Sequence, residues 1–138
     1  VIATARTKRS QVPAHLSWIG SSEKPDLEYL LRESDFVLLA CPLNEHTTGM
    51  IGSCQLNLMK PTAVLVNVAR GAVVDETALW EALQNRRISG AIIDVWWGSH
   101  ESGNPSLKGY QWHTLDNVVM TPHSSGWTYA GSEGRRIT

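Results

Sequence analysis

The residues that could carry chemistry stand directly after short apolar runs of the sequence. A cation, a carboxylate and an imidazole each follow a different run, as Arg70, Asp94 and His123. Arginine presents a planar, permanently charged fork that suits a carboxylate. Histidine exchanges protons near neutral pH because its ordinary pKa lies there. Together these residue types predict a site that binds an anionic substrate and transfers a proton to or from it.

Each of these residues alone also has a purely structural explanation. Arg70 could be a surface arginine, and Asp94 could form a turn or cap a helix. His123 could be a histidine at a strand end whose ring is hydrogen-bonded within the fold. Their joint occurrence at the ends of separate apolar runs favours the functional interpretation, because such ends meet along one rim of a parallel sheet.

The elements that must position these residues follow from the apolar pattern. Short continuous apolar runs are typical of strands buried on both faces of a parallel sheet. Helix patterns separate the runs, and the clearest begins at the capping residue Asp75. This alternation predicts an α/β fold with a doubly wound parallel sheet. The predicted strands are 1–4, 15–19, 36–40, 63–66, 90–95 and 117–120; the predicted helices are 25–33, a short helix capped by Ser53, and one after Asp75 with Leu79, Ala82 and Leu83 on its buried face; 20–22 is predicted to be a turn.

Composition excludes several classes of function. The 138 residues are 42% hydrophobic, which is enough for the core of one domain. The net charge of −1 argues against binding to nucleic acid or to an anionic membrane. No apolar run is long enough to span a bilayer, and no signal peptide is recognised. The two cysteines, Cys41 and Cys54, lack metal-site spacing, so we expect no zinc site, no disulfide scaffold and a cytoplasmic location.

Four stretches carry a family resemblance. SDFVLLACPLNEHTTGMIG, MKPTAVLVNVARGAVVDETAL, GAIIDVWW and NVVMTPHSSGW resemble, in this order, the nucleotide-binding domain of the D-isomer-specific 2-hydroxyacid dehydrogenases. The resemblance covers nearly the whole chain and implies a Rossmann-like fold that binds NAD or NADP. It implies hydride transfer between that cofactor and a small D-2-hydroxy or 2-keto acid, and a homodimer in the full-length parent. It also implies that Arg70 binds the substrate carboxylate, that His123 is the acid/base, and that the cofactor contacts are Cys41, Pro42, His46, Val68, Ala69, Arg70, Asp94, His123 and Gly126.

Two departures from the family pattern concern individual side chains. The family usually pairs its histidine with a glutamate five residues after the aspartate, but that position is Ser99, and Glu101 is the nearest carboxylate. We therefore expect His123 to be either unassisted or paired with Glu101, as a third catalytic residue. The acidic residue that holds the ribose of NAD is also missing. Ala5 occupies its place and Arg6 follows, which favours NADP over NAD; the alternative is an ordinary solvated basic turn.

Two further departures concern whole segments. The sequence contains no GxGxxG loop, so the strand that precedes such a loop is predicted to be missing. The strand order of the family implies that this strand would lie between the strand at Val1 and the strand at Phe36. No substrate domain is present either. Residues 1–138 are therefore interpreted as a partial nucleotide-binding domain that is inactive alone. The alternatives are a cofactor-sensing, corepressor-like binding protein and a non-functional fragment.

The tryptophans leave one question open. Four of the six fall between positions 96 and 127, in or near a long polar loop. They could line the substrate side of the cleft or pack beneath the loop. The four are Trp96, Trp97, Trp112 and Trp127.

Overall fold

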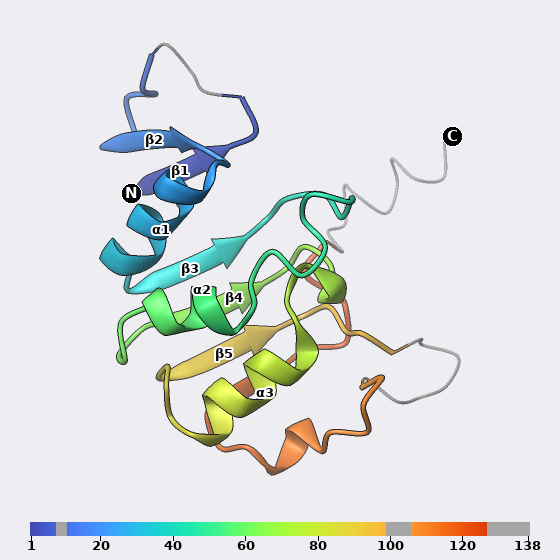
Figure 1. The fold of residues 1–138 in the computed structure, drawn as a ribbon. Helices are drawn as coiled ribbons and strands as arrows, with labels where there is room; N and C mark the ends of the chain where they lie inside the picture. Colours follow the sequence, from blue (N-terminus) through green and yellow to red (C-terminus); the bar gives the residue numbers. More distant parts are fainter. Residues whose placement is uncertain (8–10, 99–105, 127–138) are drawn as a thin grey trace, which may run out of the picture.

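The chain is built of parallel strands, and an α-helix follows each of the second, third and fourth strands (Figure 1). The computed structural model describes residues 1–7, 11–98 and 106–126. Short 3₁₀ turns, η1 (Gly71–Val73) and η3 (Trp112–Thr114), interrupt the loops. The strands are β1 (Ile2–Ala5), β2 (Trp18–Ser21), β3 (Phe36–Leu39), β4 (Val64–Asn67), β5 (Gly90–Ile93) and β6 (Val118–Met120), and the helices are α1 (Lys24–Glu33), α2 (Ser53–Leu58) and α3 (Glu76–Gln84).

The strands form two separate parallel sheets. Strand β1 pairs with β2, and a second sheet has the order β3-β4-β5-β6. Within the described ranges no ladder joins β1 to β3, and a slot of about 550 Å³ lies between them. The slot is lined by both strands and by Leu27 and Leu30 of α1. This confirms the predicted interruption between the strands at Val1 and Phe36.

Helices cover one face of the four-stranded sheet, and side chains of β3 are exposed on the other face. Helix α2 contacts both α1 and α3, and the three helices lie on the same side of the strands (Figure 1). Successive side chains of a strand point to opposite faces. In β3, Val37 and Leu39 are therefore buried in the core, whereas Phe36 is 71% and Leu38 62% exposed. No described helix covers the face that carries Phe36 and Leu38.

The capping of α3 is as the sequence predicts. The Asp75 side chain accepts a hydrogen bond from the backbone N–H of Ala78, at 2.7 Å. This bond satisfies one of the free donors in the first helical turn. Leu79, Ala82 and Leu83 are all buried against the sheet.

Two local predictions are wrong. The predicted turn at 20–22 begins inside β2, because the Asp26 carboxylate accepts hydrogen bonds from the backbone N–H and hydroxyl of Ser21, at 2.7 and 2.8 Å. The Asp26 carboxylate thus stabilises the extended conformation of Ser21 at the end of β2, which the local sequence does not predict. The predicted cap of α2, Ser53, is its first helical residue instead. Gly52 is the cap, and its backbone N–H donates to Gln55 Oε1 at 3.2 Å.

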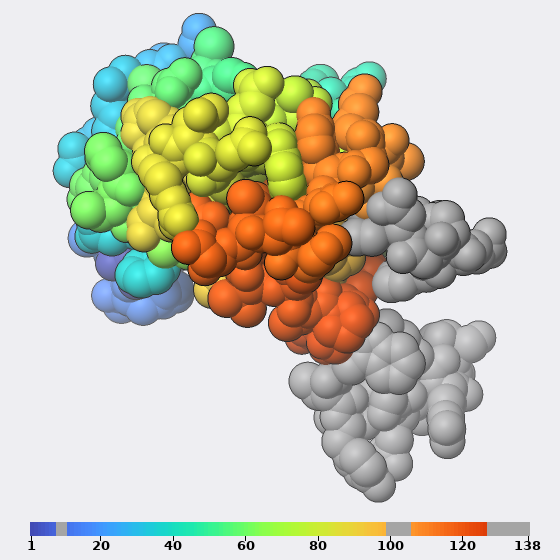
Figure 2. All heavy atoms as spheres, turned by 90° about the horizontal axis from the view of Figure 1, so that it is seen from below, coloured from blue at the N-terminus to red at the C-terminus, as the bar shows by residue number. Residues whose placement is uncertain are grey.

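The segment between β5 and β6 is anchored by aromatic packing. Trp112 is 1% exposed and stacks on Trp97, with ring centroids 5.3 Å apart. Trp80 of α3 meets Trp112 edge-on and stacks on Tyr110. Figure 2 shows the segment 106–126, in orange, lying against the yellow-green surface of α3. Trp112 therefore packs beneath the loop. Trp127 lies outside the described residues.

The helices of the described ranges are all too short or too polar to cross a membrane.

Candidate active site

The register of the sheet brings the predicted site residues to one edge. Leu39, Asn67, Ile93 and Met120 are consecutive partners across β3, β4, β5 and β6. Asp94 follows this row directly. Arg70 and His123 each stand three residues beyond their strand's partner in it. Adjacent strands lie about 4.8 Å apart, so β4 and β6 are separated by about 10 Å. Arg70, Asp94 and His123 therefore emerge from neighbouring strands at the same carboxyl edge.

The turn that presents Arg70 is built by a buried asparagine. Asn67 is 1% exposed, and its side-chain oxygen accepts from the backbone N–H of Ala69 at 3.1 Å. Its side-chain nitrogen donates to the backbone oxygen of Arg70, also at 3.1 Å. The Arg70 side chain is exposed, with Nη1 donating to the carbonyl of Ala69 at 2.7 Å. The remaining guanidinium donors suit a planar anion such as a carboxylate.

Gly71 allows the two central turns to meet. A Cβ at this position would lie 2.4 Å from the carbonyl oxygen of Trp96 and 2.9 Å from the backbone nitrogen of Trp97. The backbone after β4 thus touches the backbone after β5, and only glycine permits that approach.

His123 stands in an unusual backbone conformation. Its φ is 59°, in the left-handed region that side chains other than glycine rarely adopt. The ring is half-buried. Two neighbouring groups anchor the turn: the indole N–H of Trp96 donates to the carbonyl of Thr121 at 3.0 Å, and the Thr121 hydroxyl donates to Asp94. These bonds hold the backbone of the His123 turn at the edge of the sheet.

Asp94 is buried and ionised. It is 2% exposed and accepts backbone N–H bonds from Ser124 at 2.9 Å and Ser125 at 3.0 Å, besides the Thr121 hydroxyl. Burial alone would raise the pKa of the Asp94 carboxyl, but the hydrogen bonds from Ser125, Thr121 and Ser124 outweigh it and hold the pKa well below the ordinary value.

Four of the predicted cofactor residues line a single cavity. It measures about 610 Å³ and lies where β1 and β3 end. Arg6 enters from the β1 side, and Cys41, Pro42 and His46 enter from the β3 side. An exposed cation beside a partly apolar wall suits a nucleotide, whose base is flat and whose phosphate is anionic. The cavity thus fits the nucleoside end of a dinucleotide. The pyrophosphate cradle that a glycine-rich loop would supply has no counterpart among the described residues.

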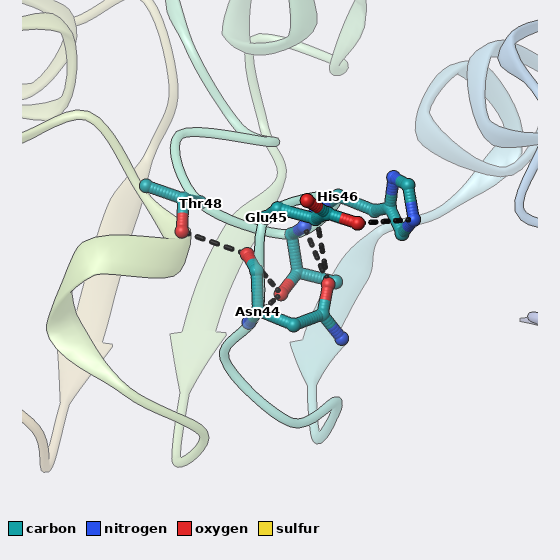
Figure 3. Close-up of polar contacts among 5 residues, drawn as sticks. Asn44, Glu45, His46 and Thr48 are labelled. Atoms are coloured by element: carbon teal, nitrogen blue, oxygen red, sulfur yellow. Dashed lines mark hydrogen bonds and ion pairs between the residues drawn. The ribbon is translucent and has the colours of Figure 1, made fainter.

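The loop that carries His46 is held by its own side chains. Asn44 Oδ1 accepts from the backbone N–H of His46 at 2.9 Å, and the Thr48 hydroxyl donates to the Asn44 carbonyl at 2.7 Å. Figure 3 shows these bonds and the His46 ring reaching Glu45, 3.3 Å from its carboxylate. His46 remains largely exposed at the mouth of the cavity.

The structure thus divides the predicted residues into two groups. Arg6, Cys41, Pro42 and His46 share the cavity, while Arg70, Asp94 and His123 share the edge across β4, β5 and β6. Val68 and Ala69 belong to the Arg70 turn, and Gly126 is exposed after the His123 turn. Glu101 and Ser99 lie outside the described residues.

Sequence reasoning missed Asn67 and Thr121. Asn67 donates to the backbone of Arg70, and the Thr121 hydroxyl donates to the Asp94 carboxylate. The available signal was a polar residue at or just beyond the end of an apolar run, a place where a side chain can hydrogen-bond the following turn.

Comparisons with known proteins agree with this geometry. Residues 1–125 match the sequence profile of the D-isomer specific 2-hydroxyacid dehydrogenase, NAD binding domain. A glyoxylate reductase of Pyrococcus furiosus is 43% identical over 133 residues, which are 96% of this chain and 37% of that protein. A glyoxylate reductase of Thermococcus onnurineus is 42% identical over 134 residues. The chain therefore spans little more than a third of the length of these relatives.

Solved structures show the same likeness. An acyclic imino acid reductase in complex with NADPH and D-Arg has a TM-score of 0.79 at 31% identity, over 99% of this chain and 39% of that one. A D-lactate dehydrogenase from Sporolactobacillus has a TM-score of 0.76 at 36% identity, over 92% of this chain and 39% of that one. The predicted Rossmann-like α/β fold is confirmed.

Proposed function

We propose that this chain, which belongs to the D-isomer specific 2-hydroxyacid dehydrogenase family through its NAD-binding domain, is the cofactor-binding part of a 2-keto acid reductase. The observation that carries the proposal is the register that brings the Arg70 and His123 turns to one edge. The reaction would interconvert a small 2-keto acid and its D-2-hydroxy acid. The glyoxylate reductases among its relatives favour a short substrate.

The proposed mechanism assigns one task to each side chain. The nicotinamide cofactor, when bound, supplies or accepts the hydride. The Arg70 guanidinium binds the substrate carboxylate and fixes the carbonyl carbon against the hydride donor. His123 donates a proton to the carbonyl oxygen during reduction and removes it from the hydroxyl during oxidation. Glu101 is the proposed partner of the His123 imidazole.

The cavity beside β1 supports NADP as the cofactor. Arg6 can reach a 2′-phosphate there, and Ala5 offers no carboxylate to the ribose hydroxyls. Cys41, Pro42 and His46 would enclose the nucleoside, and Val68 and Ala69 would contact the nicotinamide half through their backbone. Asp94 and Gly126 would contact the nicotinamide side as well. The matching family model is described as an NAD-binding domain, so the proposal includes both NADP and NAD as cofactors.

Four features belong to the same proposal. We infer that residues 1–138 are part of a larger protein with a separate substrate domain, and that the chain alone is inactive. We also infer a homodimer of the full-length parent. A cytoplasmic location is supported by Cys41 and Cys54, both of which are unpaired thiols.

The deciding experiment measures NADPH and NADH oxidation by the full-length protein, with glyoxylate and hydroxypyruvate as substrates. His123→Asn is expected to lower kcat by about 100-fold or more, because general acid catalysis is lost. Arg70→Lys is expected to raise the KM for the keto acid about tenfold, because a point charge replaces the two-pronged contact. Arg32→Lys, on the exposed surface of α1, is the matched control.

An alternative in a different class is a cofactor-sensing corepressor. The relatives named above are reductases and dehydrogenases, so they give it no support. Turnover of either keto acid that depends on His123 argues for the enzyme. Tight dinucleotide binding without turnover in the full-length protein would refute the proposed reaction.

A further inference from the structure

Two buried polar side chains lie beneath the edge that carries Arg70 and His123. Asn67 ends β4 and is 1% exposed, and Asp94 follows β5 and is 2% exposed. The two are adjacent, because the backbone N–H of Asp94 donates to the backbone oxygen of Asn67 at 3.1 Å. Burying a polar group costs free energy unless it is hydrogen-bonded. The partners of these two side chains therefore show what the burial accomplishes.

Asn67 directs its side chain to one turn. Its carboxamide accepts from Ala69 and donates to the carbonyl of Arg70, at 3.1 Å in each case. The planar carboxamide of Asn67 thus makes one hydrogen bond to each of two successive residues. The backbone from Val68 to Arg70 is thereby held in one conformation, and with it the origin of the Arg70 side chain.

Asp94 directs its side chain to the other turn. Its carboxylate accepts from the Thr121 hydroxyl on one side of His123, and from the backbone N–H groups of Ser124 and Ser125 on the other. These bonds straddle the histidine, whose φ of 59° is costly for a residue with a side chain. Such conformations persist only where the surroundings over-determine them, and the three bonds to Asp94 meet that condition.

We propose that Asn67 and Asp94 are positioning residues, which hold the turns of Arg70 and His123 in the geometry that the proposed reaction needs. The inference rests on the proposed function and deepens it. Asp94 was expected from the sequence to contact the cofactor, and the bonds to Thr121, Ser124 and Ser125 give it a second task. Neither side chain needs to touch the substrate for this task.

The division of partners predicts a division of kinetic effects. Asn67 bonds the turn of the residue that binds the carboxylate, so its loss should act on the KM for the keto acid. Asp94 bonds the turn of the proton donor, so its loss should act on kcat. A residue that only stabilised the fold would lower the folded fraction and, with it, the apparent kcat, but it would leave every KM and the kcat of each folded molecule unchanged. The kcat values below are therefore expressed per folded molecule, with the folded fraction measured by urea unfolding.

The kinetic test uses the full-length protein and a conservative rescue. Thr121→Val removes the hydroxyl that donates to Asp94 and keeps the shape of the side chain. It is expected to lower kcat about tenfold with both KM values within about twofold, and Thr121→Ser is expected to restore kcat. Asn67→Ala is expected to raise the KM for the keto acid about tenfold. Thr114→Val, which removes an exposed hydroxyl bond to Gln111, is the matched control.

A second measurement does not depend on turnover. Amide hydrogen exchange of Ser124 and Ser125 should accelerate about tenfold or more in Asp94→Asn, while the amides within β4 and β5 keep their protection. If the parent reduces no keto acid but this exchange responds, the proposed function fails and the positioning stands. Unchanged exchange at both serines overturns the positioning. An increase confined to the KM for NADPH in Thr121→Val also overturns it, because Asp94 would then act through the cofactor.

Discussion

Substituting Gly71 by alanine is expected to disturb the carboxyl edge of the sheet, because the turns after β4 and β5 touch at this residue. The added Cβ would lie 2.4 Å from Trp96 O, 2.5 Å from Trp96 C and 2.9 Å from Trp97 N. Ordinary contact begins near 3.4 Å, so the backbones after β4 and β5 must separate by about 1.0 Å, from 3.4 − 2.4. No side-chain rotation can relieve the clash, because all three atoms belong to the main chain.

The size of the effect follows from this geometry. Overpacking a close contact costs about 1–3 kcal/mol, and a contact between main chains belongs at the upper end. Alanine also lowers the conformational entropy of the unfolded chain, which offsets about 0.4–1 kcal/mol of this loss of stability. We therefore expect Gly71→Ala to lower the free energy of unfolding by about 2 kcal/mol. Because Gly71 follows Arg70 directly, the shift should also lower kcat/KM, by up to about 100-fold for a displacement of about 1 Å.

The assay compares Gly71→Ala with Gly52→Ala in the full-length protein. A Cβ at Gly52 would lie 3.6 Å from its nearest neighbour, Gln55 Oε1, in ordinary contact. Gly52 caps α2, where alanine is a poorer cap, so a loss below about 1 kcal/mol is expected there. Urea unfolding measures the first effect and steady-state kinetics the second. Equal losses of stability and unchanged kcat/KM in both variants would refute the close-approach argument.

Three further predictions concern other parts of the structure. The pKa of Asp94 is lower in the folded than in the unfolded protein, so the stabilisation by the ionised Asp94 is complete above about pH 4 and is lost as pH falls through the folded-state pKa. In pH-dependent unfolding, the difference in the free energy of unfolding between the wild type and Asp94→Asn should therefore narrow below about pH 4. A constant difference would contradict this prediction. Trp112→Ala should cost about 3–5 kcal/mol in urea unfolding, because the side chain is 1% exposed, and a loss below about 1 kcal/mol would show that it does not anchor the loop. Arg6→Gln should raise the KM for NADPH about tenfold and leave that for NADH within about twofold, and an equal change for both cofactors would remove Arg6 from the phosphate site.

The sequence predicts the parallel sheet and its helices well because the signals are local. Asp75 caps α3, and the residues spaced along the helix after it are buried, as the pattern requires. The end of β2 was mispredicted because its cause is tertiary. Ser21 is extended because Asp26, on the following helix, accepts two of its hydrogen bonds. Residue types alone indicate a turn there.

The position of the candidate residues at one edge of the sheet was predictable, whereas the hydrogen bonds between them were not. The places of Arg70 and His123 after apolar runs predicted this common edge, and their functional roles stay a prediction. Thr121 could not be identified from the sequence, because its hydrogen-bond partner, Asp94, belongs to the neighbouring strand and depends on strand register. Asn67 was missed although its partners, Ala69 and Arg70, are local. The question about the tryptophans was also a matter of packing. Trp112 has aromatic neighbours from α3 and from the segment after β5, a combination that no local pattern records.

The division of the sheet also divides the walls of the cavity that is lined by Arg6, Cys41, Pro42 and His46. Thr4, Ala5, Arg6 and Ser22 form one wall of that cavity and belong to the β1–β2 half, while the opposite wall follows β3. No ladder crosses from one half to the other within the described ranges, and helix α1 bridges them. A ligand that touches both walls would therefore link two halves that are joined by helix α1 and, among the described residues, by no strand ladder. Part of the free energy of binding would then be used to order the two halves relative to each other. The affinity for the dinucleotide would therefore be higher in a protein whose halves are already rigidly joined.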